Sequence, residues 1–555
     1  MRKNVAKVLR FLIALFVPGT RPFAGQKNRS GEARRVFKMW AKDKFSGSLI
    51  LMRQLNLYVL ALALCGVICG CARVPRNWLQ ISYTGGSSAA QVTVDWTNVV
   101  RVSRSTPTLQ VVVNPPLRRG SAIHAPVFKE LKELGAQEVR YVPWLPYPKL
   151  AVAELQPPTA TNTSWDFSLI DPMTLDFLNA TKGHSPILNF STMPAWLFKT
   201  PQPITYPSDP NEVFWNYTQG TELADPTGKQ LGDYYARLVS WYHLGGFTDE
   251  AGARHHSGYH YDIPWWEVLN EVEAEHQTTP QQYTKRYDAI VTAIHAVSPK
   301  TRFVGLALAF EDNLDFFSYF LNATNHQPGV PLDMISYHFY ANPGDGASIT
   351  NPGAWHFCEQ ADGFLAKVRR VEAIRQRLSL ATMTDIDELG VIANDDNTWK
   401  GRPIYWNAAG AMYAYLYLEL SKLGIEYVGE SQLVGYPTQY PSVSMVNWET
   451  GKPNARFRVL ELLKNNFKPG DKIVATDITS TNVAAQIYET RYGTKLLLVN
   501  KENVTVPVNL PANTRGTRID IVDGTTGENP PQRSLVSDQQ VVLNPFAVAV
   551  VSLAK

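Results

Sequence analysis

The chain has 555 residues, of which 45% are apolar, 18% are charged and 11% are aromatic. This length exceeds one ordinary domain, and the composition is that of a globular protein with a large core. The net charge of +4 conceals an asymmetry, because residues 1–53 hold 13 Lys/Arg and 2 Asp/Glu, which leaves 40 basic against 47 acidic residues elsewhere. Clustered basic residues mark nucleic-acid binding, and their absence from the folded part excludes that class of function.

The basic N-terminal segment leads into an apolar run from Leu57 to Gly70. Its 14 residues are too few for a membrane-spanning helix of about 20, but they suit the core of a signal peptide. Met52 and Arg53 would form a short positive segment before this core, and the stretch "ICGC", which ends at Cys71, resembles a bacterial lipobox. We therefore predict export, with residues 1–73 as a basic tail plus a signal or anchor segment.

The form of export stays open. If Met52 is the true start, a cleaved signal gives a secreted protein or an envelope lipoprotein with Cys71 as its lipidated residue. An uncleaved signal anchor, with its basic flank in the cytoplasm by the positive-inside rule, is the alternative. Cys358 is the single cysteine of the folded part, which excludes a disulfide framework and a cysteine-type zinc site there.

Residues 108–465 alternate apolar strand-like runs with amphipathic helical runs. Such alternation predicts a parallel sheet, and eight units predict a (β/α)8 TIM barrel. An open, doubly wound sheet usually carries a Gly-rich phosphate loop, and the chain has neither a G-x-G-x-x-G nor a Walker A motif. The predicted strands are, in chain order, TLQVVVN, QEVRYVPW, SPILNFS, IPWWEVLNE, TRFVGLAL, DMISYHFY, LATMTDIDE and IEYVGESQLV.

The two flanks of the barrel region show a different pattern. Residues 466–555 contain short strand-like runs, among them KLLLVNKE and FAVAVVSL, with turn residues between them. This pattern predicts a C-terminal antiparallel β-sandwich. Residues 74–107 contain the strand-like run VTVDW, which is available to join that sandwich.

Two glutamates occupy the predicted carboxyl ends of barrel strands, Glu271 after the fourth strand and Glu388 after the seventh. Working residues of TIM barrels lie at these ends, and strands four and seven face each other across the barrel mouth. In glycoside hydrolysis, one carboxylic acid protonates the leaving oxygen and a second carboxylate attacks the anomeric carbon. We therefore predict this pair to be catalytic, and we expect Glu273 and Glu275 to be first-turn helix acids favoured by the helix dipole.

The sequence predicts neither a cofactor nor a metal. His255, His256 and His260 cluster in a loop, but their spacing is irregular and is not that of histidines on one helix face. The nucleophile elbow of serine hydrolases, G-x-S-x-G, is absent.

Several stretches together resemble glycoside hydrolase family 39. The Asn270–Glu271 pair resembles the acid/base signature of the large retaining glycosidase clan built on TIM barrels. The stretches WDFSLIDPMTLDFLNATKGHSPILNFSTMPAWLF, DYYARLVSWYHLGGF and DMISYHFY extend the resemblance to roughly residues 90–555. Because the family contains β-xylosidases and α-L-iduronidases, the resemblance implies a retaining glycosidase whose partners are glycosides and oligo- or polysaccharides.

The resemblance also implies residue roles. Glu271 would be the acid/base, Glu388 the nucleophile and Asn270 the amide that hydrogen-bonds the sugar 2-hydroxyl. His338 and Tyr340 would hold the nucleophile and the sugar. The implied substrate-binding residues are thus Asn270, His338, Tyr340 and, as a stacking platform in the VNWETG loop, Trp448.

The sequence departs from the family pattern in two places. The second strand reads RYVPWLPYP, where many members carry a His-Gly pair, so the sugar stays open. The seventh reads TDIDELG, where a simple Thr-Glu is usual, so Asp385 and Asp387 remain alternative nucleophiles.

We predict a β-xylosidase-like activity, and two alternatives remain. A uronic-acid glycosidase of the α-L-iduronidase or β-glucuronidase type would need a cationic clamp for the sugar carboxylate, and Arg140 and Lys149 are the nearest candidates. The second alternative is a noncatalytic carbohydrate-binding barrel. The sequence leaves linkage, exo or endo action and oligomeric state open.

Overall fold

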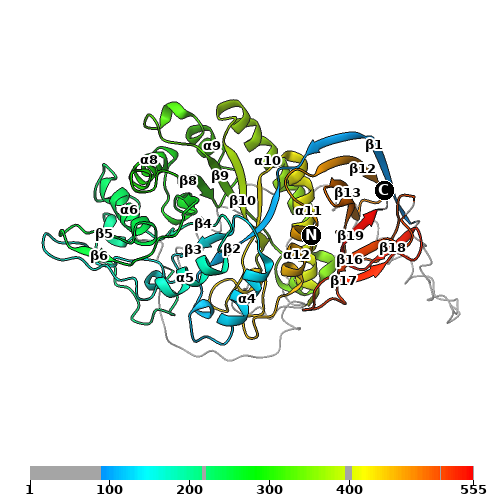
Figure 1. The fold of residues 1–555 in the computed structure, drawn as a ribbon, viewed down its shortest axis with the longest axis horizontal. Helices are drawn as coiled ribbons and strands as arrows, with labels where there is room; N and C mark the ends of the chain where they lie inside the picture. The colour runs from blue at the N-terminus through cyan, green and yellow to red at the C-terminus, as the bar shows by residue number, and fades with distance from the viewer. Residues whose placement is uncertain (1–88, 216–219, 394–402, 513, 554–555) are drawn as a thin grey trace, which may run out of the picture. The chain divides into compact units, whose positions relative to one another are not determined.

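The computed structural model describes residues 89–215, 220–393, 403–512 and 514–553. The predicted tail and signal or anchor segment, with Cys71, lies outside these ranges. Within them, no helix is both long enough and apolar enough to cross a membrane. They form a barrel with surrounding helices and a second, largely antiparallel sheet (Figure 1).

Eight parallel strands close into the barrel, in the order β10-β11-β2-β3-β4-β7-β8-β9, which confirms the predicted (β/α)8 fold. Each strand is followed by a helix before the next strand of the barrel begins. The strands are β2 (Thr106–Val112), β3 (Arg140–Val142), β4 (Ile187–Leu188), β7 (Trp265–Glu267), β8 (Arg302–Leu308), β9 (Met334–Ala341), β10 (Met383–Val391) and β11 (Tyr427–Glu430). The helices are α4 (His124–Leu134), α5 (Asp171–Ala180), α6 (Lys229–His243), α8 (Pro280–Val297), α9 (Leu314–Phe320), α10 (Phe357–Leu378), α11 (Pro403–Leu423) and α12 (Ala455–Asn466).

Local sequence signals mark the ends of these helices. At the start of α8, the Thr279 side chain accepts a hydrogen bond from the Gln282 backbone, and the Gln282 side chain accepts one from the Thr279 backbone. This capping box satisfies two backbone donors that have no partner within the helix. At the end of α4, Gly135 adopts a left-handed φ of 57° and stops the helix.

Two insertions interrupt the regular alternation. Strands β5 (Gly246–Thr248) and β6 (Arg254–His256) form an antiparallel hairpin between α6 and β7. A single helical turn, α7 (Val272–Glu275), follows β7 before α8 begins. The second insertion matters for the site, because Glu271 immediately precedes it.

The barrel interior is apolar at the amino ends of the strands and polar above them. Ile187, Trp265, Val304 and Met334 form a separate apolar cluster at these ends. The guanidinium carbon of Arg302 lies 4.0 Å from the ring centroid of Trp265 and covers the cluster from outside. The polar side chains therefore gather toward the carboxyl ends, where TIM barrels carry their sites.

The second sheet has nine strands in the order β17-β16-β19-β14-β13-β12-β1-β15-β18. Its apolar side chains, including Val92, Ile487 and Leu498, enclose a core separate from that of the barrel, as expected for a sandwich. The strands are β1 (Ala90–Val102), β12 (Lys472–Ile478), β13 (Val483–Thr490), β14 (Gly493–Asn500), β15 (Val506–Asn509), β16 (Arg518–Val522), β17 (Gln532–Leu535), β18 (Gln540–Leu543) and β19 (Val548–Leu553).

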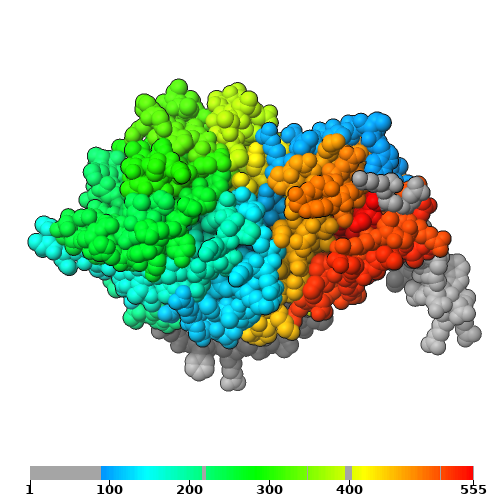
Figure 2. Space-filling model, viewed as in Figure 1, coloured from blue at the N-terminus to red at the C-terminus, as the bar shows by residue number. Residues whose placement is uncertain are grey.

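Strand β1, which contains the VTVDW run, belongs to this sheet. It pairs antiparallel with β12 along most of its length and parallel with β15 at Ala90 and Gln91. In the space-filling view its blue residues lie against the orange residues of the C-terminal strands (Figure 2). The predicted antiparallel β-sandwich is thus confirmed, and this one parallel pair arises because β1 arrives from before the barrel and not through a hairpin.

The outer face of the sandwich packs on α11 and α12 of the barrel. Leu497 and Val550 of the sandwich share an apolar cluster with Leu420 and Leu463 of these helices. The barrel and the sandwich therefore share part of one core. This shared packing holds the barrel loops and the sandwich loops that lie near the interface.

Candidate active site

A cavity of about 100 Å³ opens at the carboxyl ends of the barrel strands. Both predicted catalytic residues, Glu271 and Glu388, line it. The other lining residues come from the ends of several strands and the loops after them: Gln110, Val112, Val142, Trp144, Asn270, Tyr340, Ile392, Ser431, Gln432, Tyr440 and Val443.

Glu271 lies beyond the regular part of its strand, because β7 ends at Glu267. The chain still follows β8, since the Glu271 backbone N–H donates to Ala307 at 2.8 Å. Leu269 and Glu271 have φ values of 66° and 40°, in the left-handed region. Such values cost a non-glycine residue about 1–3 kcal/mol and concentrate at functional sites.

Glu388 lies inside β10 at a β-bulge. Asp385 pairs with Ser336 of β9, but Glu388 pairs with His338, so three residues of β10 oppose two of β9. A bulge breaks the alternation by which neighbouring side chains point to opposite faces. Asp387 and Glu388 consequently both reach Arg140 in the barrel interior.

The carboxyl groups of Glu271 and Glu388 lie close together. One oxygen of each, together with a ring nitrogen of His338, all lie within 4.8 Å of one another. His338 Nδ1 is 2.8 Å from Glu271 Oε1 and 3.6 Å from Glu388 Oε2. The predicted strand-six histidine thus contacts the predicted acid/base more closely than the predicted nucleophile.

The His338 ring is buried. Burial alone would lower its pKa, but the carboxylates of Glu388 and Asp387 reverse this effect and hold the pKa well above the usual value. Glu271, His338 and Glu388 are the one His/carboxylate cluster with metal-ligand spacing among the described residues. Because His338 Nδ1 already contacts Glu271 and the ring is held as a cation, the arrangement fits a hydrogen-bonded pair of acids better than a metal centre.

Tyr340 lies where the sequence predicts, against the nucleophile candidate. Its hydroxyl donates to Glu388 Oε2 at 2.6 Å and lies 2.6 Å from Ser431 Oγ. The Gln110 side chain donates to the same serine oxygen at 2.6 Å. Burial and the charge of Glu388 keep the pKa of Tyr340 well above its usual value, so the hydroxyl keeps its proton.

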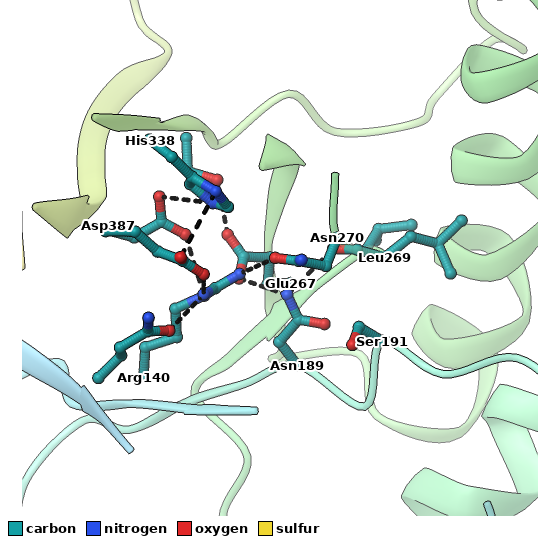
Figure 3. A network of polar contacts seen from close by, with 12 residues as sticks. Arg140, Asn189, Ser191, Glu267, Leu269, Asn270, His338 and Asp387 are labelled. Atoms are coloured by element: carbon teal, nitrogen blue, oxygen red, sulfur yellow. Dashed lines mark hydrogen bonds and ion pairs between the residues drawn. The ribbon is translucent and has the colours of Figure 1, made fainter. Parts of the chain in front are cut away.

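Arg140 joins the residues beneath the cavity. Its side chain extends between Asp387 and Glu267 and reaches Asn270 (Figure 3). Nη1 donates to Glu388 Oε1 at 2.5 Å, Nη2 donates to Asn270 Oδ1 at 2.7 Å, and Nε lies 2.9 Å from Asp387 Oδ2 and also pairs with Glu267. One guanidinium therefore positions the predicted nucleophile and the predicted sugar-binding amide together.

The acids around Arg140 have different charge states. Burial raises the pKa of Glu267 to about 7 despite its ion pair with Arg140. Burial also acts on Asp387, but the charges of Arg140 and His338 outweigh it and lower the pKa. Asp385 is buried beside Asp387 and Glu267, and its pKa lies well above the usual value. Neither Asp385 nor Asp387 lines the cavity, in contrast to Glu388.

Glu275 lies in the first turn of α7, as the sequence predicts, but it is also buried against the site. It is 3% exposed, and its Oε1 accepts from Trp144 Nε1 at 2.5 Å and from Asn270 Nδ2 at 3.1 Å. Burial and the charge of Glu271 raise its pKa to about 8. Asn270 is therefore fixed from both sides, because its amide nitrogen faces Glu275 and its oxygen faces Arg140.

Two predicted site residues do not line this cavity: His338 lies behind Glu271 and Glu388, which it contacts, and Trp448 lies elsewhere. Trp448 lines a second cavity, and the described linings of the two cavities share no residue. The loop after β11 carries Trp448 toward Trp406 and the sandwich loop that contains Gly527.

The aromatic wall of the first cavity instead comes from residues that sequence reasoning missed. Trp144, in the loop after β3, and Tyr440, in the loop after β11, line the cavity with rings 6.2 Å apart and 18° from parallel. Trp215 packs edge-on against both. The available signal was the position of Trp144, which follows the carboxyl end of a barrel strand.

The two candidate cations for a uronic-acid clamp are engaged elsewhere. Arg140 is buried among Glu267, Asp387 and Glu388, and Lys149 donates to the Ser208 carbonyl at 2.9 Å. No lysine or arginine is among the described residues that line the cavity.

Comparisons with known proteins add independent findings. A family model described as glycosyl hydrolases family 39 matches residues 87–388. No curated protein matches the chain. Solved structures similar to it include family 51 α-L-arabinofuranosidases from Bifidobacterium longum (TM-score 0.57, 14% identity) and Thermotoga petrophila (TM-score 0.56, 13% identity). A GH30 endoxylanase from Clostridium papyrosolvens is also similar (TM-score 0.51, 14% identity). Each comparison covers 84% of this chain and 100% of the other, and at these identities it establishes the fold alone.

Proposed function

The chain belongs to glycosyl hydrolase family 39, and from this membership we propose that Glu271 and Glu388 perform a double displacement at a terminal sugar of the β-xyloside type. The protein is a glycoside hydrolase, and a retaining mechanism is characteristic of its clan. The observation that carries the assignment of residues is that one oxygen of Glu271 and one oxygen of Glu388 lie within 4.8 Å of each other in one cavity. Retaining pairs lie about 5–5.5 Å apart, whereas inverting pairs leave room for water at about 6.5–9.5 Å.

In the first step, Glu388 attacks the anomeric carbon while Glu271 protonates the leaving oxygen, so one C–O bond forms as another breaks. Arg140 and Tyr340 each donate to one oxygen of Glu388, which orients the attacking carboxylate and stabilises its negative charge. In the second step, Glu271 takes a proton from water, the water oxygen bonds to the anomeric carbon, and Glu388 is released.

Glu271 is suited to exchange protons with solvent. Its side chain is 21% exposed, against 10% for Glu388. Asn270 is fixed between Arg140 and Glu275 and lines the cavity together with Glu271, which supports its assignment to the sugar 2-hydroxyl.

The shape and charge of the cavity support a neutral sugar at a chain end. Its volume of about 100 Å³ lies below the roughly 300–1,000 Å³ of sites for drug-sized ligands, which fits one ring better than an extended chain. A xylose ring carries no exocyclic hydroxymethyl group and is small among pyranoses. The lack of a lysine or arginine among the described lining residues disfavours a uronic acid.

Azide rescue tests the two roles with one reagent. In Glu388→Ala, azide attacks the anomeric carbon directly, so an aryl β-xyloside should give the α-glycosyl azide. In Glu271→Ala, azide attacks the glycosyl-enzyme, so the product should be the β-azide. The assignment would be contradicted if either variant hydrolysed the aryl β-xyloside at the wild-type rate. It would also be contradicted if azide did not rescue Glu388→Ala.

A panel of aryl glycosides tests the sugar. We expect the highest kcat/KM for the β-D-xyloside, and rates at least 100-fold lower for β-D-glucuronide and α-L-iduronide. A preference for either uronide would overturn the proposed sugar and leave the catalytic pair intact.

We also propose export of the chain, which the basic segment, the apolar run and the lipobox-like stretch before Cys71 support. Expression of the full chain with radiolabelled palmitate tests the lipoprotein form. Label that is present in the wild type and lost in Cys71→Ala would support it. Membrane retention without label would favour the signal anchor, and recovery in the cytoplasm would overturn export.

A further inference from the structure

The cavity that contains Trp448 is separate from the catalytic cavity and larger, at about 350 Å³. Three parts of the chain form it: the start of α11, the loop after β11 and the β16–β17 loop of the sandwich. Because α11 follows β10 and the second loop follows β11, two of these parts lie at the catalytic end of the barrel.

An unsatisfied amide lies in this cavity. Asn407 of α11 is 3% exposed, and its Nδ2 has no hydrogen-bond partner among the residues that the structure describes. A buried donor without a partner costs about 1–3 kcal/mol, and native proteins rarely leave one without a reason. The amide is therefore available to a ligand oxygen.

The other lining groups complement this donor. Trp406 and Trp448 provide two indole rings, and Glu449 and Glu528 provide carboxylate acceptors. The described lining contains no lysine or arginine, although Lys452 lies 3.2 Å from the Glu528 carboxylate at the edge. A Cβ at Gly524 or Gly527 would meet no atom within 4 Å, so this side of the cavity is open.

We propose that this cavity is a second carbohydrate-binding site for a neutral sugar ring. A pyranose has apolar C–H faces that stack on indoles, and hydroxyl groups that both accept from an amide and donate to carboxylates. An anionic sugar would meet two carboxylates, and a purely apolar ligand would leave Asn407 unsatisfied. A site of this kind would hold a polysaccharide near the catalytic end of the barrel without taking part in bond cleavage.

Equilibrium titration by calorimetry tests the proposal on the full chain. The Glu388→Gln variant is used so that ligand is not consumed, and the probes are xylotriose, cellotriose and arabinotriose. We expect two saturable sites for at least one trisaccharide. Adding Asn407→Leu or Trp448→Ala should weaken one of them at least tenfold and leave the other unchanged.

Trp96→Ala is the matched control, because Trp96 is an exposed tryptophan of β1 that lines neither cavity, and both sites should persist. Thermal unfolding of each variant verifies folding, and Trp448→Ala carries the test if Asn407→Leu unfolds. If only one site is observed and both substitutions abolish it, the result would support binding in the second cavity and contradict binding in the catalytic cavity. A single site, or two sites, insensitive to both substitutions would overturn the proposal.

Discussion

At the residue scale, Arg140 connects most of the buried charge in the barrel. It is 1% exposed and pairs with Glu267, Asp387 and Glu388. Such a network is costly to desolvate, and its value depends on every partner being present. The orientation of Glu388 and Asn270 therefore depends on one cation that contributes no atom to the cavity surface.

Arg140→Met should destabilise the folded state by about 3–5 kcal/mol, because it leaves buried carboxylates without their cation. Denaturant unfolding measures the change. Arg302→Met is the matched control, since Arg302 is half-exposed and stacks on Trp265, a contact worth about 0.5–1 kcal/mol. Equal losses in the two variants would contradict the role assigned to Arg140.

At the element scale, close packing of helices positions the loops around the site. Gly232 of α6 faces α8 so closely that a Cβ would lie 2.6 Å from the Ala289 carbonyl oxygen. Gly363 of α10 lies in a helix interior too, but a Cβ there would meet nothing within 4 Å. Alanine at these two positions should therefore change stability in opposite directions.

Gly232→Ala should destabilise the protein by about 1–3 kcal/mol, because α6 and α8 must move apart. Gly363→Ala should stabilise it by about 0.5–1 kcal/mol through helix propensity alone. Thermal or denaturant unfolding of both variants compares them directly. The same sign for both substitutions would refute the packing argument.

The sequence predicts the elements better than their irregularities. Alternation of strands and helices is a repeated signal, so the eight-unit barrel and the Asn270–Glu271 pair follow from it. The bulge in β10 carries no such signal, because one extra residue turns Asp387 and Glu388 to the same side without changing the apolar pattern. The parallel pairing of β1 with β15 depends on contacts that are distant in sequence and is likewise not predictable from local pattern.

The aromatic residues of the site are a second feature that the sequence does not predict. Trp448 follows a barrel strand, as Trp144 does, and loop position alone does not separate them. Only the packing of the loops directs Trp144 to the first cavity and Trp448 to the second. Glu275 likewise has the sequence position of a first-turn helix acid, and only tertiary contacts show that it is buried beneath Asn270.

At the scale of the whole molecule, buried carboxyl groups make stability depend on pH. Burial raises the pKa of Glu154 and Glu275 to about 8, and that of Glu267 and Glu430 to about 7. The unfolded chain releases these protons near pH 4.5, whereas the folded chain keeps them to higher pH. Their contribution to stability is therefore complete below about pH 4.5 and is lost as the pH rises through 7 to 8.

The midpoint temperature of thermal unfolding should consequently decrease as the pH rises from 6.5 to 8.5. Burial lowers the pKa of His276 to about 4, so this residue makes stability rise with pH. That effect is confined to pH values below about 6.5 and lies outside the window. Glu275→Gln should reduce the slope in this window, since each proton bound on folding changes stability by about 1.36 kcal/mol per pH unit. Calorimetric melting across the window checks this, and an unchanged slope in Glu275→Gln would contradict the buried, protonated state of Glu275.

We propose that Glu388 forms the covalent bond to the sugar while Glu271 transfers protons. Incubation with an activated 2-deoxy-2-fluoro-β-xyloside, followed by peptide mass spectrometry, tests it most directly, because the fluorine slows release of the glycosyl-enzyme. We expect one added sugar on the peptide that contains Glu388, attached to that residue. A label on Asp385, Asp387 or Glu271, or turnover without any covalent label, would contradict it.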